Sequence, residues 1–84
     1  MAKEADTVRI TIVAFGPVAE QLGGRRHELD VPAASTVRHV VKQLDLEEWI
    51  SFGLSVAIDG DRCDMETVVN QGIELALLPP VSGG

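Results

Sequence analysis

The chain has 84 residues, of which 45% are apolar, and a formal net charge of −6. This length fits one domain, residues 1–84, whose small core leaves little room for an enclosed catalytic pocket. The acidic balance opposes nucleic-acid binding, which depends on clustered Lys and Arg, and favours a basic protein partner. No apolar run approaches the ~18 residues of a membrane span and no secretory signal is recognisable, so we expect a cytoplasmic protein that does not bind membranes.

Cysteine and histidine are too few for a metal site of the usual kind. Cys63 is the single cysteine, which excludes an internal disulfide and fits a reducing compartment. His27 and His39 lie on different expected elements and are expected to be solvated. We therefore predict no metal and no bound cofactor, and interpret Cys63 as a small packing residue in preference to a nucleophile.

The first half of the chain begins with two alternating segments. Alternation of apolar and other residues over 8–15 predicts a strand with one covered face, which Gly16-Pro17 ends. Residues 18–22 are expected to form a short helix that a glycine pair closes. A second alternation over 27–31 predicts a strand antiparallel to the first.

The middle of the chain has the strongest helical pattern. Ser35 or Thr36 can cap this helix. Its buried stripe has the spacing i, i+3, i+4, i+7 and comprises Val37, Val40, Val41 and Leu44. Asp45 and Glu48 have the spacing of a variant capping box, so a further helical turn is expected to end at Gly53.

The last third of the chain is predicted to form strands. Residues 54–58 alternate before an Asp-Gly turn at 59–60, a brief return strand is expected around Cys63, and residues 73–78 alternate until a proline pair ends them. This element order predicts an α+β domain of the β-grasp type, a mixed sheet of four to five strands with helices on one face. The first and last strands should be parallel neighbours at its centre. The globular core is predicted to span residues 7–78.

Residues 79–84 have the composition of a thin, flexible tail. Pro79 and Pro80 favour extended geometry, and no residue after Val81 has a branched side chain. Fully extended, six residues reach roughly 20 Å, enough to enter another protein's active site. The alternative is a frayed terminus without function.

A carboxylate at the end of this tail needs activation before it can react. It is ionised at neutral pH, with a reference pKa of about 3.5, and is a poor electrophile. Attack on the α-phosphate of ATP would convert it into an acyl-adenylate. The chain has no phosphate loop of the Walker form, so a partner must consume the ATP.

Three segments resemble the MoaD/ThiS family of ubiquitin-like sulfur carriers over residues 8–84. They are the strand ending in Phe15-Gly16-Pro17, the Asp59-Gly60 turn and the ending Leu77-Leu78-Pro79-Pro80-Val81-Ser82-Gly83-Gly84. The Pro-Pro-Val-Ser-Gly-Gly ending is more similar to the small subunit of molybdopterin synthase than to the thiamine sulfur carrier. Two positions depart from the family pattern: Gly72-Ile73-Glu74 stands where relatives usually have Gly-Asp-Glu, and Leu78 stands where an aromatic residue is common.

The resemblance implies a specific chemistry for the tail. Gly84 would be adenylated, converted to a thiocarboxylate, and would donate sulfur to the cyclic pyranopterin precursor in molybdenum cofactor biosynthesis. Gly83 would allow passage through a narrow channel, with Pro79, Pro80, Val81 and Ser82 as the partner-binding tail. The implied partners are a molybdopterin synthase large subunit in a heterotetramer, a ubiquitin-activating-like adenylyltransferase and a sulfur donor enzyme. The chain would not be an enzyme on its own.

Other readings remain open. The chain can be the sulfur carrier of another pathway, such as cysteine, thiamine or tRNA thiolation, or a ubiquitin-like modifier joined through Gly84 to lysines. It can also be an interaction domain with an inert tail. Lys3 and Lys42 are candidate acceptors in a tagging system.

An apolar patch is expected on the sheet face away from the helices. If Ile10 and Ile12 point toward the helices, Phe15 points away from them, because side chains alternate along a strand. The predicted partner-docking surface comprises Phe15, Val13, Ala76 and Leu78. Packing under a second layer is the alternative for Phe15. Trp49 is expected in the core, on the stripe that includes Leu46 and Ile50.

Overall fold

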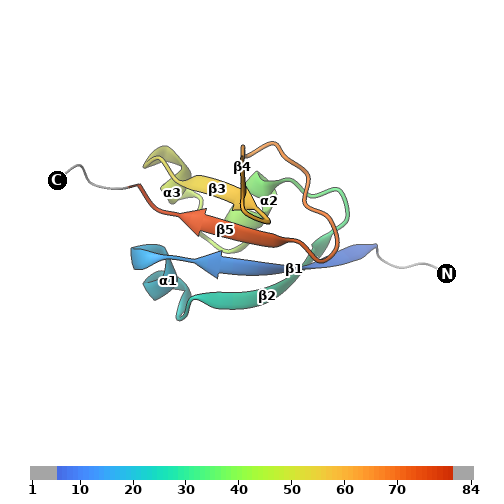
Figure 1. Ribbon diagram of the computed structural model, residues 1–84, viewed down its shortest axis with the longest axis horizontal. Coiled ribbons are helices and arrows are strands. Elements are labelled where there is room, and N and C mark those ends of the chain that lie inside the picture. Colours follow the sequence, from blue (N-terminus) through green and yellow to red (C-terminus); the bar gives the residue numbers. More distant parts are fainter. Residues whose placement is uncertain (1–5, 81–84) are drawn as a thin grey trace.

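The computed structural model describes residues 6–80 and contains a mixed sheet of five strands in the order β2-β1-β5-β3-β4 (Figure 1). The strands are β1 (Thr7–Ala14), β2 (Arg26–Pro32), β3 (Ser55–Ile58), β4 (Asp61–Cys63) and β5 (Glu74–Leu78). The central pair, β1 and β5, is parallel, and every other neighbouring pair is antiparallel. The predicted parallel pairing of the first and last strands is confirmed.

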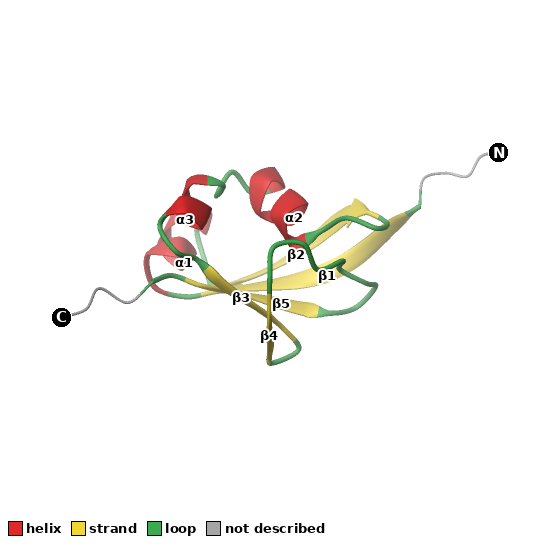
Figure 2. Ribbon diagram, turned by 90° about the horizontal axis from the view of Figure 1, so that it is seen from above, coloured by secondary structure: helices red, strands yellow, loops and turns green. Residues whose placement is uncertain are grey.

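Three helices cover one face of this sheet and leave the other face open, as Figure 2 shows. They are α1 (Gly16–Leu22), α2 (Val37–Gln43) and α3 (Glu48–Ser51). The predicted α+β class with helices on one face is therefore confirmed. Among residues 6–80, no helix is long and apolar enough to cross a membrane.

The core lies between the helices and the sheet because the strands alternate. Ile10, Ile12 and Ala14 of β1 are completely buried, as are Leu75 and Leu77 of β5. The buried stripe of α2 completes this core with Val37, Val40 and Val41. Burial of each large aliphatic side chain stabilises the fold by about 1.5–3 kcal/mol, so this interface accounts for most of the favourable free energy of folding.

The start of α2 agrees with its sequence. Thr36 has extended φ and ψ, and its hydroxyl oxygen accepts a hydrogen bond of 3.2 Å from the backbone N–H of His39. This bond satisfies one of the N–H groups that a helix start leaves unpaired. Of the two predicted caps, Thr36 is the one used, while the hydroxyl of Ser35 donates to the carbonyl of Pro32.

The predicted capping box before the last helical turn is wrong. Glu48 is the first residue of α3, it follows Glu47, and no side chain caps the helix. Asp45 lies in the preceding turn with φ +64°. Asp45 instead ends α2: its N–H bonds to the carbonyl of Lys42 and the N–H of Leu46 bonds to that of Val41, both at 3.0 Å, which is the Schellman pattern of a helix C-terminus.

The β3–β4 hairpin sets the register at one edge of the sheet. Asp59 and Gly60 form its two-residue loop, and both have positive φ (50° and 88°) as a type I′ turn requires. The predicted Asp-Gly turn and the return strand around Cys63 are both confirmed. This register places Arg62 opposite Ala57 on β3.

Candidate functional site

The root of the tail leaves the middle of the sheet between two glycine turns. β5 ends at Leu78, and Pro79 and Pro80 continue between the start of α1 and the end of α3 (Figure 1). A Cβ built on Gly16 would lie 3.5 Å from Cγ of Pro79, and one built on Gly53 would lie 3.7 Å from Cβ of Pro80. These two turns border the chain at the point where it leaves the domain.

Both bordering glycines have a backbone that L-residues rarely adopt. Gly16 has φ +55° and Gly53 has φ +100°. The predicted parallel pairing of the first and last strands places Gly16, two residues after β1, beside the tail, whereas the contact of Gly53 with Pro80 follows from no predicted pairing. The rest of the predicted tail, Val81, Ser82, Gly83 and Gly84, lies outside the described residues.

The four residues of the predicted docking surface lie together on the open face. Val13 pairs with Ala76 across the parallel strands, and Leu78 pairs with Ser55. These three side chains are half-buried, and Phe15 is 36% exposed. The open face therefore carries a contiguous apolar patch beside the tail root, the kind of surface that proteins use for association.

Ala57 belongs to the same patch, although the sequence did not single it out. It pairs with Ala76 and is 6% exposed, yet it is absent from the core cluster on the helix side. Ala57 is two residues after Ser55 on β3, so both point to the open face. The alternation of side chains along a strand could therefore have predicted its position.

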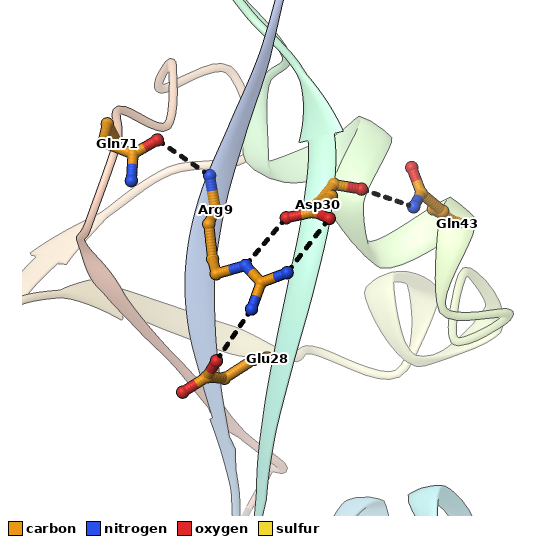
Figure 3. Close-up of polar contacts among 5 residues, drawn as sticks. All are labelled: Arg9, Glu28, Asp30, Gln43 and Gln71. Atoms are coloured by element: carbon orange, nitrogen blue, oxygen red, sulfur yellow. Dashed lines mark hydrogen bonds and ion pairs between the residues drawn. The ribbon is translucent and has the colours of Figure 1, made fainter.

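The opposite end of the open face carries an ion-pair network (Figure 3). Arg9 on β1 donates to both carboxylate oxygens of Asp30 at 3.0 and 3.3 Å and to Glu28 at 3.2 Å. The hydrogen bond and charge of Arg9 lower the pKa of Asp30, and Asp30 in turn raises the pKa of Arg9. All three side chains are more than half exposed, so solvent weakens these pairs.

Two glutamines connect this network to its surroundings in Figure 3. The side-chain oxygen of Gln71 accepts a bond of 3.0 Å from the backbone N–H of Arg9, and Gln43 of α2 donates to the carbonyl of Asp30 at 3.3 Å. The second bond occupies an acceptor on β2, an edge strand, and so removes one site at which another strand could pair.

Cys63 has the environment of a packing residue. It is half-buried, pairs with buried Val56 and packs against the core. Burial raises the pKa of its thiol, which lowers the thiolate fraction at neutral pH. These facts agree with the interpretation of Cys63 as a small core residue. Within residues 6–80, no three His, Cys, Asp or Glu side chains lie where they could hold a metal ion.

Two aromatic residues near the tail root differ from the expectation. Trp49 is half-buried at the margin of the core, and its indole N–H donates to Gln21 at 3.0 Å. Phe52, which no sequence pattern singled out, is 58% exposed and packs edge to face against Trp49, with 5.7 Å between the ring centroids. It directly precedes Gly53, the glycine that borders Pro80. His27, expected to be solvated, is half-buried, and its Nε2 lies 2.9 Å from the carbonyl oxygen of Gly24.

The sheet order and the helix-covered face define a ubiquitin-like β-grasp domain, here with an apolar open face beside its last strand. Residues 12–84 match the model of the ThiS family, and the chain belongs to this family. It therefore has the fold of the ubiquitin-like sulfur carriers of the ThiS and MoaD type.

Solved structures agree with this assignment. SAMP1 from Haloferax volcanii is 30% identical over 90% of this chain and 99% of that chain, with a TM-score of 0.72. The HVO 2177 protein of Haloferax volcanii is 20% identical over 100% of this chain and 93% of its own, with a TM-score of 0.85. A complex of subunits 1 and 2 of the molybdopterin-converting factor from Helicobacter pylori 26695 matches at 24% identity, covering 92% and 100%, with a TM-score of 0.59. A comparison with curated proteins finds no match.

Proposed function

We propose that the chain is a sulfur carrier that acts as the small subunit of molybdopterin synthase, with the carboxyl group of Gly84 as its working group. The observation that carries this proposal is the tail root: in a member of the ThiS family, Pro79 and Pro80 leave the central strand at a place bordered by two glycine turns. The apolar open face lies at the same end of the sheet. A partner that docks on this face receives the tail at a defined position.

The proposed chemistry has two steps on this chain. The Gly84 carboxylate attacks the α-phosphate of ATP in the active site of an adenylyltransferase and releases pyrophosphate. A sulfide equivalent from a sulfur donor enzyme then attacks the acyl carbon and expels AMP, which leaves a thiocarboxylate. The ATP is consumed by the partner, and no cofactor is assigned to this chain.

The large subunit of molybdopterin synthase is the proposed partner in the sulfur-transfer step. Support comes from the matching complex of subunits 1 and 2 of a molybdopterin-converting factor and from the Pro-Pro-Val-Ser-Gly-Gly ending. In a complex of this chain with the large subunit, the thiocarboxylate would transfer its sulfur to the cyclic pyranopterin precursor, and water would supply the oxygen that restores the carboxylate. A heterotetramer of two small and two large subunits is the proposed assembly.

A second candidate function is protein modification. The 30% identical relative and a 26% identical structure are small archaeal modifier proteins by name. Both functions begin with the same acyl-adenylate and differ in the nucleophile that follows, sulfide for the carrier and a lysine amine for the modifier. Lys42, exposed on α2, is a candidate acceptor on this chain, and Lys3 lies outside the described residues.

The test is the mass of the C-terminal fragment after incubation with ATP, the adenylyltransferase and a sulfur donor. We expect sulfur to replace one oxygen at Gly84. Fragmentation is required because oxidation of Met65 adds nearly the same mass. A chain lacking Gly83 and Gly84 is the control. An isopeptide between Gly84 and a lysine would favour the modifier, and an unchanged terminus with a competent enzyme would contradict both functions.

The pathway needs a second measurement. The thiocarboxylated chain is mixed with the large subunit and the cyclic pyranopterin precursor, and the dithiolene product is measured. Product formation would establish the molybdenum cofactor branch. Failure with this acceptor, together with a sulfur-loaded terminus, would reassign the chain to another sulfur-transfer pathway.

A further inference from the structure

One row of side chains crosses the whole open face and has an arginine at each end. Val13 pairs with Arg26 on one side and Ala76 on the other. The row continues through Ala57, which pairs with both Ala76 and Arg62. Directly paired residues point to the same face, so three small apolar residues separate Arg26 from Arg62. The five strands put the two backbones four strand spacings apart, roughly 19 Å.

A third arginine lies nearer the tail. The guanidinium carbon of Arg25 is 5.9 Å from the centre of the Phe15 ring, within the range of a cation–π contact. Phe15 follows β1 by one residue, so it is on the same side of the sheet as Val13. We call Arg25, Arg26 and Arg62 the arginine frame. It borders the apolar patch at the end of the sheet where Pro79 begins the tail.

The other end of the open face has the opposite charge. Glu28, Asp30 and Glu74 lie there with Arg9, which gives three carboxylates against one guanidinium and a net charge of −2. The net charge of −6 for the whole chain conceals this division. The open face is therefore polarised along its strands, with a net positive end beside the tail root and a net negative end away from it.

Ion pairs among the described residues neutralise little of the positive charge of the arginine frame. Arg26 has one ion pair, with Glu74 at 3.4 Å, and both side chains are about half or more exposed, so it contributes little to stability. Arg62 makes no ion pair with any described residue. Asp64, two residues further on, accepts hydrogen bonds at one carboxylate oxygen from the backbone N–H of Glu66 and the hydroxyl of Thr67. These donors are neutral, so Asp64 keeps its charge, and three arginines against this one carboxylate leave a net charge of +2.

We propose that the arginine frame docks onto a partner surface whose apolar centre is bordered by carboxylates, placed around the opening that admits the tail. This inference rests on the proposed function and specifies the partner's chemistry. Total charge predicts a basic partner, but the charge beside the tail predicts an acidic opening, with basic groups further away opposite Glu28 and Asp30. A docking rotated by half a turn would bring like charges together, so the polarity also selects the orientation in which the tail meets the opening.

Arg62→Glu tests the frame, with Lys42→Glu as the matched control. Both changes alter the net charge by −2 at exposed residues, but Lys42 lies on α2, on the helix side. The dissociation constant for the adenylyltransferase is measured by calorimetry, and KM and kcat by ATP–pyrophosphate exchange, at low and high salt. Thermal unfolding of each variant verifies that it is folded.

We expect Arg62→Glu to raise the dissociation constant and KM roughly tenfold with little change in kcat, because charges at an interface rim act mainly on association. Lys42→Glu should stay within about twofold, and Arg62→Lys should retain most of the affinity. Salt should weaken wild-type binding and narrow the gap between wild type and Arg62→Glu. Equal losses in the two reversals, or wild-type affinity for Arg62→Glu, would overturn the proposal.

The proposal for the arginine frame and the proposal for the sulfur-carrier function can be refuted separately. Binding is measured without turnover, so an adenylyltransferase that binds but gives no exchange would contradict the carrier function and still test the frame. Exchange that depends on Gly83 and Gly84 but not on Arg62 would support the carrier function and refute the frame. An enzyme that does not bind the wild-type chain would refute both.

Discussion

The two faces of the sheet are made by the same strands but have different tasks. On the helix side, Ile10, Ile12 and Leu75 are completely buried in one core. On the open side, Thr11, Val13 and Ala76 alternate with them and remain partly exposed. Because neighbouring residues belong to opposite faces, we expect that substitutions one residue apart change stability and the proposed partner docking separately.

The largest expected contrast is between Leu77 and Leu78, neighbours on β5. Leu77 is completely buried, so Leu77→Ala should lower the free energy of unfolding by about 3–4 kcal/mol through lost burial and a residual cavity. Leu78 is half-buried on the open face, so Leu78→Ala should cost about 1 kcal/mol or less. Urea unfolding measures both changes.

The same pair separates docking from folding. Leu78→Ala should weaken binding to the adenylyltransferase severalfold, whereas Leu77→Ala, at a temperature where it is folded, should bind like wild type. If both variants lost similar stability, or if Leu78→Ala bound normally, the division of β5 between two faces would not describe this protein.

The tail root offers a second contrast, between two glycines that both have positive φ. Gly53 borders Pro80 at φ +100°, while Gly60 has φ +88° and nothing within 4 Å of a built Cβ. Asn tolerates positive φ better than most residues, so Gly53→Asn and Gly60→Asn should each cost about 1 kcal/mol of stability.

Only Gly53→Asn should affect the reaction. Its Cβ would lie in van der Waals contact with Pro80 at 3.7 Å, and the amide group beyond it is expected to redirect the tail. The kcat for adenylation should therefore fall, while KM, which the proposed docking face would determine, stays near the wild-type value. ATP–pyrophosphate exchange measures both constants. Equal kcat values in the two variants would show that Gly53 has no part in placing the tail.

The parts of the fold that could be predicted depend on short-range patterns. The alternation along β1 and β5 indicated which side chains face the core. Asp59-Gly60 indicated a hairpin, because Asp and Gly can adopt the two positive φ angles that its turn requires. The apolar patch on the open face followed from the same alternation, because Val13 and Ala76 are out of phase with the core. These predictions need only the period of a strand and the preferences of a turn.

The features that the sequence did not predict have a common physical cause. The Asp45–Glu48 spacing suggested an N-cap, but Asp45 takes part in the C-terminal cap of α2 with a left-handed backbone. Contact between Gly53 and Pro80 joins segments far apart in the chain, and the arginine frame depends on the register of four strand pairs. Such features arise from tertiary arrangement, which a single sequence without an alignment does not reveal.

A smaller effect is expected at the start of α2, on the covered face. Thr36→Ala removes the hydroxyl that accepts the His39 N–H, which should cost about 1 kcal/mol. Thr36→Ser keeps the hydroxyl and should retain most of the stability. Because α2 does not reach the open face, neither change should affect binding. Equal losses in the Ala and Ser variants, measured by urea unfolding, would show that the cap bond contributes nothing.

The smallest effect belongs to the polar end of the open face and depends on pH. Arg9 lowers the pKa of Asp30 in the folded chain, so this pair stabilises the fold above the unfolded pKa of about 3.9 and loses its effect as the pH falls through the lower folded value. Both groups are exposed, so the change in stability should be slight.

The coupling between the two residues is measured by thermal unfolding from pH 7 to pH 2. The chains compared are the wild type, Asp30→Asn, Arg9→Gln and the double variant. We expect a small favourable coupling at pH 7 that disappears at acidic pH. A coupling that persists at pH 2 would mean that the two side chains act through packing and not through charge, and the polarity of the open face would then matter for binding alone.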